Sequence, residues 1–219
     1  MFSLVIKDIL LVKKTILLGF AYMIFFLVAF QGMGNTAFIS AVVAYTYILI
    51  MTIAAYEEKN NADILLNSFP IKRQGIVLSK YVSGLVCLVI SIIIYWMITF
   101  FIQIFGVNLK VFPITAIDII SVLLSVSIVN GIYLPVFFKF GYIKSKFFNL
   151  ILFLLIFAGA SSIVGVFEEG QGNAFVHSIL SFLNKQSEFQ ISLYLIGIIL
   201  VITIVSYIIS LYFYREREF

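Results

Sequence analysis

Charged residues are scarce in this chain, at 11% of 219 residues, whereas soluble globular proteins carry about 25%. So few charges cannot cover a surface that faces water, and 63% of the residues are hydrophobic. The single cysteine, Cys87, excludes an internal disulfide, and the single His177 excludes a site built from several histidines. The net charge of +4 is small, and we expect no nucleic-acid partner. The composition predicts an integral membrane protein.

Catalytic and nucleotide-binding motifs are also missing from the sequence. It contains no GxxxxGK[ST] phosphate loop, no H-E-x-x-H and no GxSxG. Its long apolar runs hold no Asp, Glu, Lys, Arg or His, which disfavours a proton-coupled carrier because such carriers need ionisable groups within the bilayer. We therefore expect no enzyme activity, metal or cofactor in this chain.

Charge-free runs indicate where the chain crosses the membrane. The run from Thr15 to Tyr56 is long enough for two helices, and the turn-forming cluster Gln31–Asn35 divides it. Four further runs complete an all-α, integral membrane fold of six transmembrane helices in a single domain, 1–219. The predicted spans are residues 15–31, 36–56, 80–105, 115–138, 147–167 and 190–213.

The distribution of basic residues predicts the orientation. An even number of spans places both termini on one side, and every lysine and arginine except Lys110 and Lys185 falls on that side. Because cytoplasmic loops are enriched in Lys and Arg, we expect both termini in the cytoplasm of a multi-pass protein of the cell membrane.

Three segments outside the spans carry apolar residues at helical spacing. Residues 2–14 fit either an amphipathic helix in the cytoplasmic interface or an extension of the first span. In the loop 57–80, Asn60 and Asp63 can cap a short helix that carries Ile64, Leu65 and Leu66. Burial against the membrane surface or another protein would stabilise this apolar cluster. The segment 168–190 predicts a short external helix.

Small and hydroxyl-bearing residues recur within two of the predicted spans. Such residues let helices approach closely and hydrogen-bond across their contact, or else line a substrate path. Both interpretations remain open for Ser83, Cys87, Ser91, Tyr95, Ser121 and Ser125.

The loop between the second and third spans resembles a known family. The stretch 57–73, which contains Ile64-Leu65-Leu66, Phe69-Pro70 and the basic pair Lys72-Arg73, is followed by Ile76-Val77-Leu78-Ser79-Lys80-Tyr81. This pattern is similar to the corresponding loop of ABC-2-type transporter permeases, and most similar to small bacterial exporters of peptides and toxins such as phenol-soluble modulins and bacteriocins. Phe69 in place of Leu and Gln74 after the basic pair are departures from the family pattern.

The resemblance implies that the short cytoplasmic helix is a coupling helix that docks on a separate ATPase. The residues implied in this contact are Glu58, Asp63, Ile64, Leu65, Leu66 and Arg73. Two ATPase subunits, which bind ATP and Mg²⁺, would work with two permease chains, either identical or paralogous. The substrate implied is hydrophobic or amphipathic, a peptide for example, and it moves outward.

Two other classes of function fit the same spans. One is an ATP-independent carrier or lipid-handling protein, and the other is a non-transporting membrane assembly subunit. A partner ATPase would separate the exporter from both.

Overall fold

A computed structural model describes residues 2–30, 32, 34–68, 72–106, 112–169 and 186–217, without the side chains of 63, 64, 67, 149–169 and 188. Within these ranges the regular structure is helical throughout. The elements are α1 (Phe2–Leu11), α2 (Lys13–Ala29), α3 (Asn35–Lys59), α4 (Ala62–Ser68), α5 (Arg73–Ile104), α6 (Ala116–Glu169) and α8 (Glu188–Glu216). The all-α prediction is confirmed.

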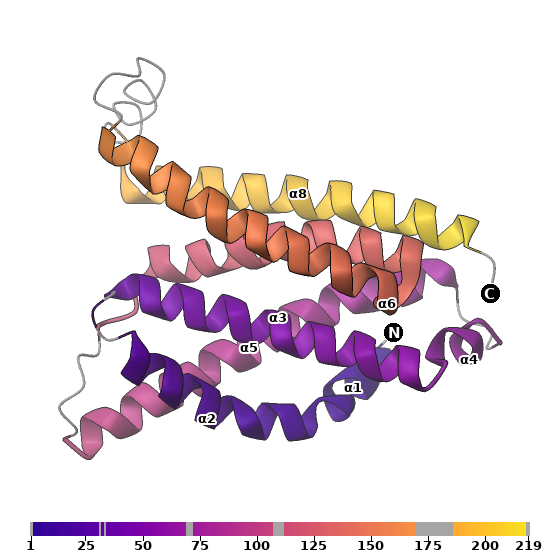
Figure 1. Ribbon diagram of the computed structural model, residues 1–219, viewed down its shortest axis with the longest axis horizontal. Coiled ribbons are helices and arrows are strands. Elements are labelled where there is room, and N and C mark those ends of the chain that lie inside the picture. The colour runs from indigo at the N-terminus through magenta and orange to yellow at the C-terminus, as the bar shows by residue number, and fades with distance from the viewer. Residues whose placement is uncertain are drawn as a thin grey trace.

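The long helices run roughly along one direction, and the two ends of the bundle differ (Figure 1). The N-terminus, the C-terminus and α4 lie at one end, which we call the termini end. The opposite end holds the connections from α2 to α3 and from α5 to α6. This arrangement fits an even number of membrane crossings.

Four helices of the described part are long and apolar enough to cross a membrane: Asn35–Lys59, Arg73–Ile104, Ala116–Phe148 and Phe189–Glu216. The bent pair α1 and α2 adds a fifth if it forms one broken span. The side chains of the predicted span 147–167 lie outside the described residues from 149 onward, as does most of the external helix predicted at 168–190. The count of six therefore stays a prediction.

The chain bends by 57° between α1 and α2, at the buried residue Val12. Helix α1 is therefore not a straight continuation of α2. It buries Leu4, Val5 and Asp8 and exposes the apolar side chains of Phe2 and Leu10. An exposed apolar face is what a helix in contact with lipid needs, although a place in the interface stays a prediction.

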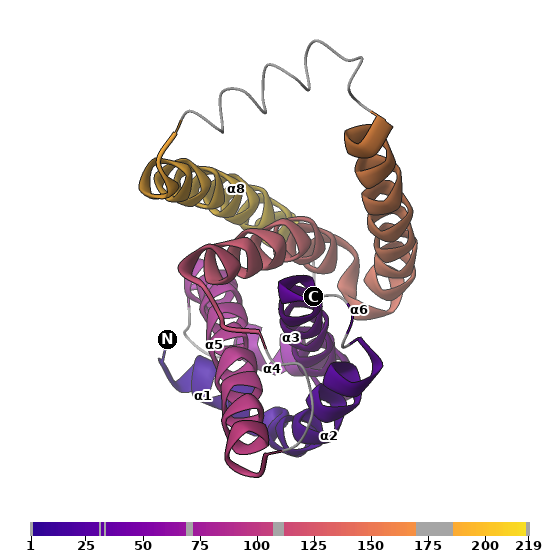
Figure 2. The ribbon, with the colours of Figure 1, turned by 90° about the vertical axis from the view of Figure 1, so that its left-hand side faces the viewer.

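Helices extend into two segments that the sequence predicts to be loops between spans. Helix α5 begins at Arg73, inside the segment expected to be a cytoplasmic loop, and it includes Gly75 in its first turn. Helix α6 passes through Pro135 without a break, and its two halves are separated at Gly141, whose backbone angles are non-helical, so the predicted break at 139–146 is narrower than expected. The positive φ of 76° at Gly141 suits glycine, which lacks a Cβ. There the helix turns back on itself (Figures 1 and 2).

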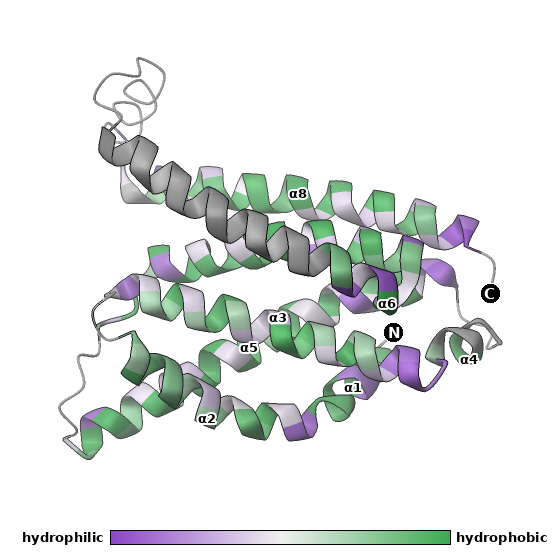
Figure 3. Cartoon of the chain, viewed as in Figure 1, coloured by the Kyte–Doolittle hydropathy of each residue, from purple (hydrophilic) through white to green (hydrophobic). Residues whose placement is uncertain are grey.

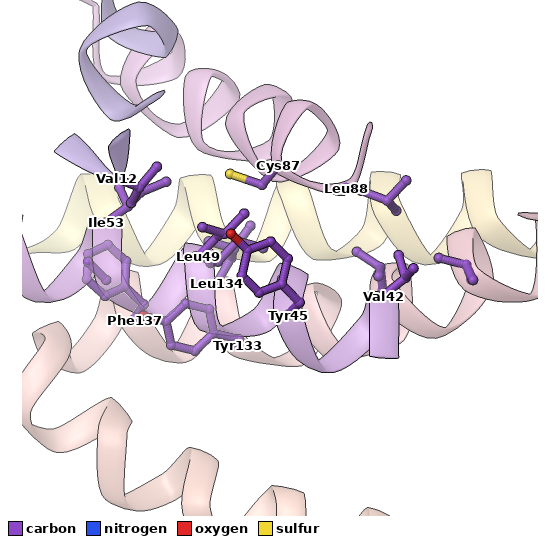
Figure 4. Packing of buried hydrophobic residues seen from close by; sticks show 14 of the residues in the cluster. Val12, Val42, Tyr45, Leu49, Ile53, Cys87, Leu88, Tyr133, Leu134 and Phe137 are labelled. Atoms are coloured by element: carbon purple, nitrogen blue, oxygen red, sulfur yellow. The ribbon is translucent and has the colours of Figure 1, made fainter. Parts of the chain in front are cut away.

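Helix α3 forms the centre of the bundle, enclosed by α2, α5 and the first half of α6 (Figure 2). Tyr45, Leu49 and Ile53 of α3 lie between Cys87 of α5 and Tyr133, Leu134 and Phe137 of α6 (Figure 4). The Tyr45 hydroxyl donates to the Thr15 carbonyl of α2 at 3.0 Å. The outward faces of the helices are mostly apolar, and hydrophilic residues gather near the helix ends (Figure 3).

Polar contacts join α3 to α6 and α5 to α8. At the end opposite the termini, Asp118 of α6 accepts hydrogen bonds from the Asn35 amide, the Thr115 amide and the Thr115 hydroxyl, each at 2.8 Å. Tyr81 of α5 shares hydrogen bonds with Ser206 and Ser210 of α8, at 2.6 and 2.9 Å. Such bonds hold helices together in lipid, where apolar side chains gain little by leaving the solvent.

Gly19 is the point of closest approach between α2 and α3. A Cβ at this position would lie 2.1 Å from the Tyr45 hydroxyl oxygen, so Gly19→Ala must displace Tyr45 from its bond to Thr15. We expect a loss of about 1–3 kcal/mol of stability, measured by thermal unfolding in detergent. Gly197→Ala on α8, where the added Cβ would meet no described residue beyond its own stretch of helix within 4 Å, is the control and should not destabilise. Equal stability of the two variants would contradict this packing.

Candidate functional site

A cluster of charged side chains is buried at the termini end, where α1, α3 and α5 meet. The Lys80 ammonium lies 3.0 Å from both carboxylate oxygens of Asp8 and 2.6 Å from Oε1 of Glu57. The Ser83 hydroxyl donates to Oδ2 of Asp8 at 2.7 Å. Lys7 contacts Glu57 and lies 3.2 Å from Oδ1 of Asp8. We call these five residues the ion cluster.

The ion cluster contains two positive and two negative groups, so its formal charges balance. Asp8 is 0% exposed, Glu57 3% and Lys80 9%. Buried charges are costly to desolvate, and they persist only when they are paired and hydrogen-bonded. Each charged group forms an ion pair with an oppositely charged group on another helix. These ion pairs fix α1 against α3 and α5. The cluster therefore specifies geometry more than it adds net stability.

The space beside the ion cluster is too small for a substrate. The partly open cavity, lined also by Tyr133, Leu134 and Phe137, measures about 20 Å³, which is room for about one water molecule. Among the described residues, no group of three or more His, Cys, Asp or Glu side chains could hold a metal ion. The arrangement is suited to holding helices in place.

Helix α4 lies in the sequence between two helices that contribute to the ion cluster, α3 and α5. It begins three residues after α3 ends at Lys59, and α5 follows it from Arg73. Leu66 is 9% exposed and belongs to the hydrophobic core, whereas Leu65 is 59% exposed. The short helix thus rests on the bundle with one leucine and presents the other outward.

The other residues predicted in the ATPase contact have different surroundings. Arg73 donates to the carbonyl oxygens of Tyr214 and Arg215, at 3.3 and 2.7 Å, so it joins the start of α5 to the end of α8. Glu58 is partly buried and accepts from the Tyr142 amide at 3.4 Å. The side chains of Asp63 and Ile64 lie outside the described residues.

The prediction that Asn60 caps the start of the short helix is wrong. Asn60 ends α3, where its amide donates to the Tyr56 carbonyl at 3.1 Å, and α4 starts only at Ala62. The positive φ of 49° at Asn61 turns the chain between the two helices. Asparagine tolerates this left-handed conformation better than most residues, so the Asn-Asn pair serves the turn.

The polar stripe predicted on α5 faces other helices in the structure. Ser83 joins the ion cluster, and Ser91 donates to the Cys87 carbonyl at 2.8 Å while it accepts from Thr46 of α3 at 3.0 Å. Tyr95 packs edge-on against Phe38 of α3, with ring centroids 4.9 Å apart. These contacts favour the helix-contact interpretation of the stripe.

The two serines of α6 are placed differently. Ser121 and Ser125 each donate to the carbonyl four residues earlier, at 2.8 Å. They therefore bond within their own helix, and these bonds join no helices.

Sequence reasoning did not find the ion cluster. Its residues lie in three segments that are far apart in the sequence, and no local pattern joins them. One signal was available: Asp8 stands among the apolar residues Val5, Ile9 and Val12, on the buried side of α1. A lone carboxylate on an apolar face needs a cationic partner, but the sequence does not say which lysine supplies it.

Removing Lys80 should test the energetic role of the ion cluster. Lys80→Met leaves two buried carboxylates with only Lys7 to balance them, so we expect a loss of about 3–5 kcal/mol in stability. The control Lys72→Met, at an exposed position, should be nearly neutral. The double variant Asp8→Asn/Lys80→Met should regain part of the loss, because the charges balance again. Losses that simply add would show that Asp8 and Lys80 do not interact.

The comparisons with known proteins agree with this architecture. The family model described as "ABC-2 family transporter protein" matches residues 3–215, which is almost the entire chain. No curated protein and no solved structure matches the chain. Proteins of this family are membrane components of ABC transporters that work with an ABC ATPase subunit. The chain belongs to the ABC-2 transporter family and is a multi-pass membrane permease component.

Proposed function

We propose that this permease drives the outward movement of a hydrophobic or amphipathic substrate, with energy from a separate ATPase that docks on α4. The family supplies the general role. The likeness of the segment 57–81 to small peptide and toxin exporters supports the direction and the substrate class. A second permease chain and two ATPase subunits, which bind ATP and Mg²⁺, complete the unit at the cell membrane of a bacterium, with both termini cytoplasmic.

The single observation that carries the docking proposal is the pair of leucines on α4. Leu65 is exposed while Leu66 anchors the helix on the bundle, which is the arrangement that a short docking helix requires. A large apolar side chain held outward on a fixed helix is suited to enter a pocket on a partner protein. The basic residues at this end indicate that α4 faces the cytoplasm, where an ATPase is available.

The ion cluster supplies a route for movement from α4 into the bundle. Glu57 lies two residues before the end of α3, and Lys80 lies two turns into α5, so both helices that flank α4 end in the same cluster. A displacement of α4 acts on both helices together. Because Asp8 and Lys7 tie α1 to them, α1 moves as well. Packed interfaces of this kind switch between discrete arrangements.

Leu65→Asp tests the docking proposal, because it places a charge at the proposed contact without disturbing the core. We expect binding of the ATPase to fall about thirtyfold or more, as for a central interface residue. The measurement is co-purification of the two proteins from membranes, followed by titration in detergent. Leu66→Asp is a poorer test because Leu66 is buried and its loss would damage the fold.

The matched control for this experiment is Phe112→Asp. It makes the same apolar-to-acidic change at an exposed position near the start of α6, at the opposite end of the bundle. This variant should bind the ATPase as the wild type does. Unchanged binding by Leu65→Asp would exclude α4 as the docking element, and no binding by the wild type would favour an ATP-independent carrier or an assembly subunit.

Substrate class is tested by ATP hydrolysis of the purified complex. An amphipathic peptide should raise the rate severalfold, because a ligand that binds one conformation better shifts the equilibrium toward it. A scrambled peptide of equal composition that cannot form an apolar face is the control. Equal rates with both peptides would rule out an amphipathic peptide as the substrate.

A further inference from the structure

A groove runs along the outer face of α3, apart from α4 and the ion cluster. It is a shallow groove that is open on its outer side, with a volume of about 450 Å³. Residues of α3 spaced at helical intervals form one wall, from Tyr47 to Lys59, and Tyr142 of α6 forms part of the other. The ion cluster contributes no residue to it.

The chemistry of the groove changes along its length. Ile48, Met51 and Ala55 provide an apolar floor, and Lys59 stands at the end nearest the bundle's termini. The Lys59 side chain is exposed and forms no ion pair with another described residue. The groove therefore has an apolar body and a cationic end.

Tyrosines accompany the lysine. The hydroxyl groups of Tyr56 and Tyr142 form no hydrogen bond to another described residue, so each can donate one to a ligand. Tyrosine is favoured where an apolar surface meets a polar one. These donors and Lys59 together match an acceptor-rich anionic group.

Neighbouring charges do not cancel Lys59. The adjacent Glu58 is turned toward α6, where it accepts from the Tyr142 amide. A Cβ on Gly141 would lie 3.6 Å from this carboxylate and 3.2 Å from the Arg217 guanidinium, so a second cation lies close to Glu58. The termini end also carries most of the basic residues of the chain. The local field favours an anion.

The length of the groove fits one leaflet of a bilayer. Twelve helical steps separate Tyr47 from Lys59, which is about 18 Å along the helix axis. Half of the hydrocarbon core measures about 15 Å. A lipid whose phosphate contacts Lys59 would therefore reach with its acyl chain to the level of Tyr47, near the middle of the membrane.

We propose that this groove binds one anionic phospholipid, with its phosphate at Lys59 and the hydroxyls of Tyr56 and Tyr142, and with an acyl chain along Ile48, Met51 and Ala55. The site depends on the membrane location of the chain and not on ATPase docking. It differs from a general lipid coat because a specific cation and a shaped apolar floor occur together. It makes the outer face of α3 a lipid-dependent surface of the permease.

Native mass spectrometry of the whole chain, released from bilayers of equal parts phosphatidylglycerol and phosphatidylcholine, tests the proposal. The wild type should retain one phosphatidylglycerol in preference to phosphatidylcholine. Lys59→Gln should lower this preference about fivefold, the effect of one basic residue near an anionic surface. Lys72→Gln removes the same charge at an exposed position outside the groove and should change it less than twofold.

Ala55→Phe tests the acyl-chain part of the groove independently of the head-group contact at Lys59. The larger side chain fills the middle of the groove and should abolish retention of the lipid, although Lys59 is intact. Should this variant fail to fold, as judged by helical circular dichroism, Ala55→Leu replaces it. Equal losses in Lys59→Gln and Lys72→Gln, or full retention after filling at position 55, would overturn the proposal. Leu65→Asp should retain the lipid, so failure of ATPase docking and failure of this site are distinguishable.

Discussion

The pairing of Lys80 with Asp8 and Glu57 is the interaction on which the rest of this structure depends. Apolar side chains alone cannot fix how α1, α3 and α5 sit together, because lipid is as apolar as they are. A buried ammonium between two carboxylates can, since every alternative arrangement leaves a charge unpaired away from water. The second lysine, Lys7, balances the charge and adds a contact between α1 and α3.

In the proposed mechanism, this constraint lets the seven-residue helix α4 act on the whole bundle. An isolated helix as short as α4 is unstable in water, so its position must come from what surrounds it. Leu66 inserts into the core, and the ends of α3 and α5 on either side are fixed by the ion cluster. Leu65 is consequently presented on a rigid support, which reduces the entropy lost on binding a partner.

The sequence predicted the elements better than their contacts. Charge-free runs predict apolar helices because a span through lipid requires about 20 apolar residues, and four such helices are present among the described residues. The ion cluster and the bond from Arg73 to the end of α8 are contacts between distant segments, so no local pattern could reveal them. From the sequence alone, a lysine beside an apolar run, such as Lys80, can be either an exposed flanking charge or a buried ion. Only the fold distinguishes the two.

Helix α3 shows why apolar periodicity gives little information in this protein. Both its faces are apolar, but one packs Tyr45, Leu49 and Ile53 into the core and the other carries Ile48 and Ala55 in an open groove. In water such a helix would need a polar outer face. In lipid the outward side can instead be specific, because shape and a single cation at the interface distinguish one neighbour from another. In the proposed lipid site Lys59, which ends α3, contacts a phosphate, whereas Glu57, two residues earlier, pairs with Lys80 inside the protein. One end of α3 therefore joins the two environments.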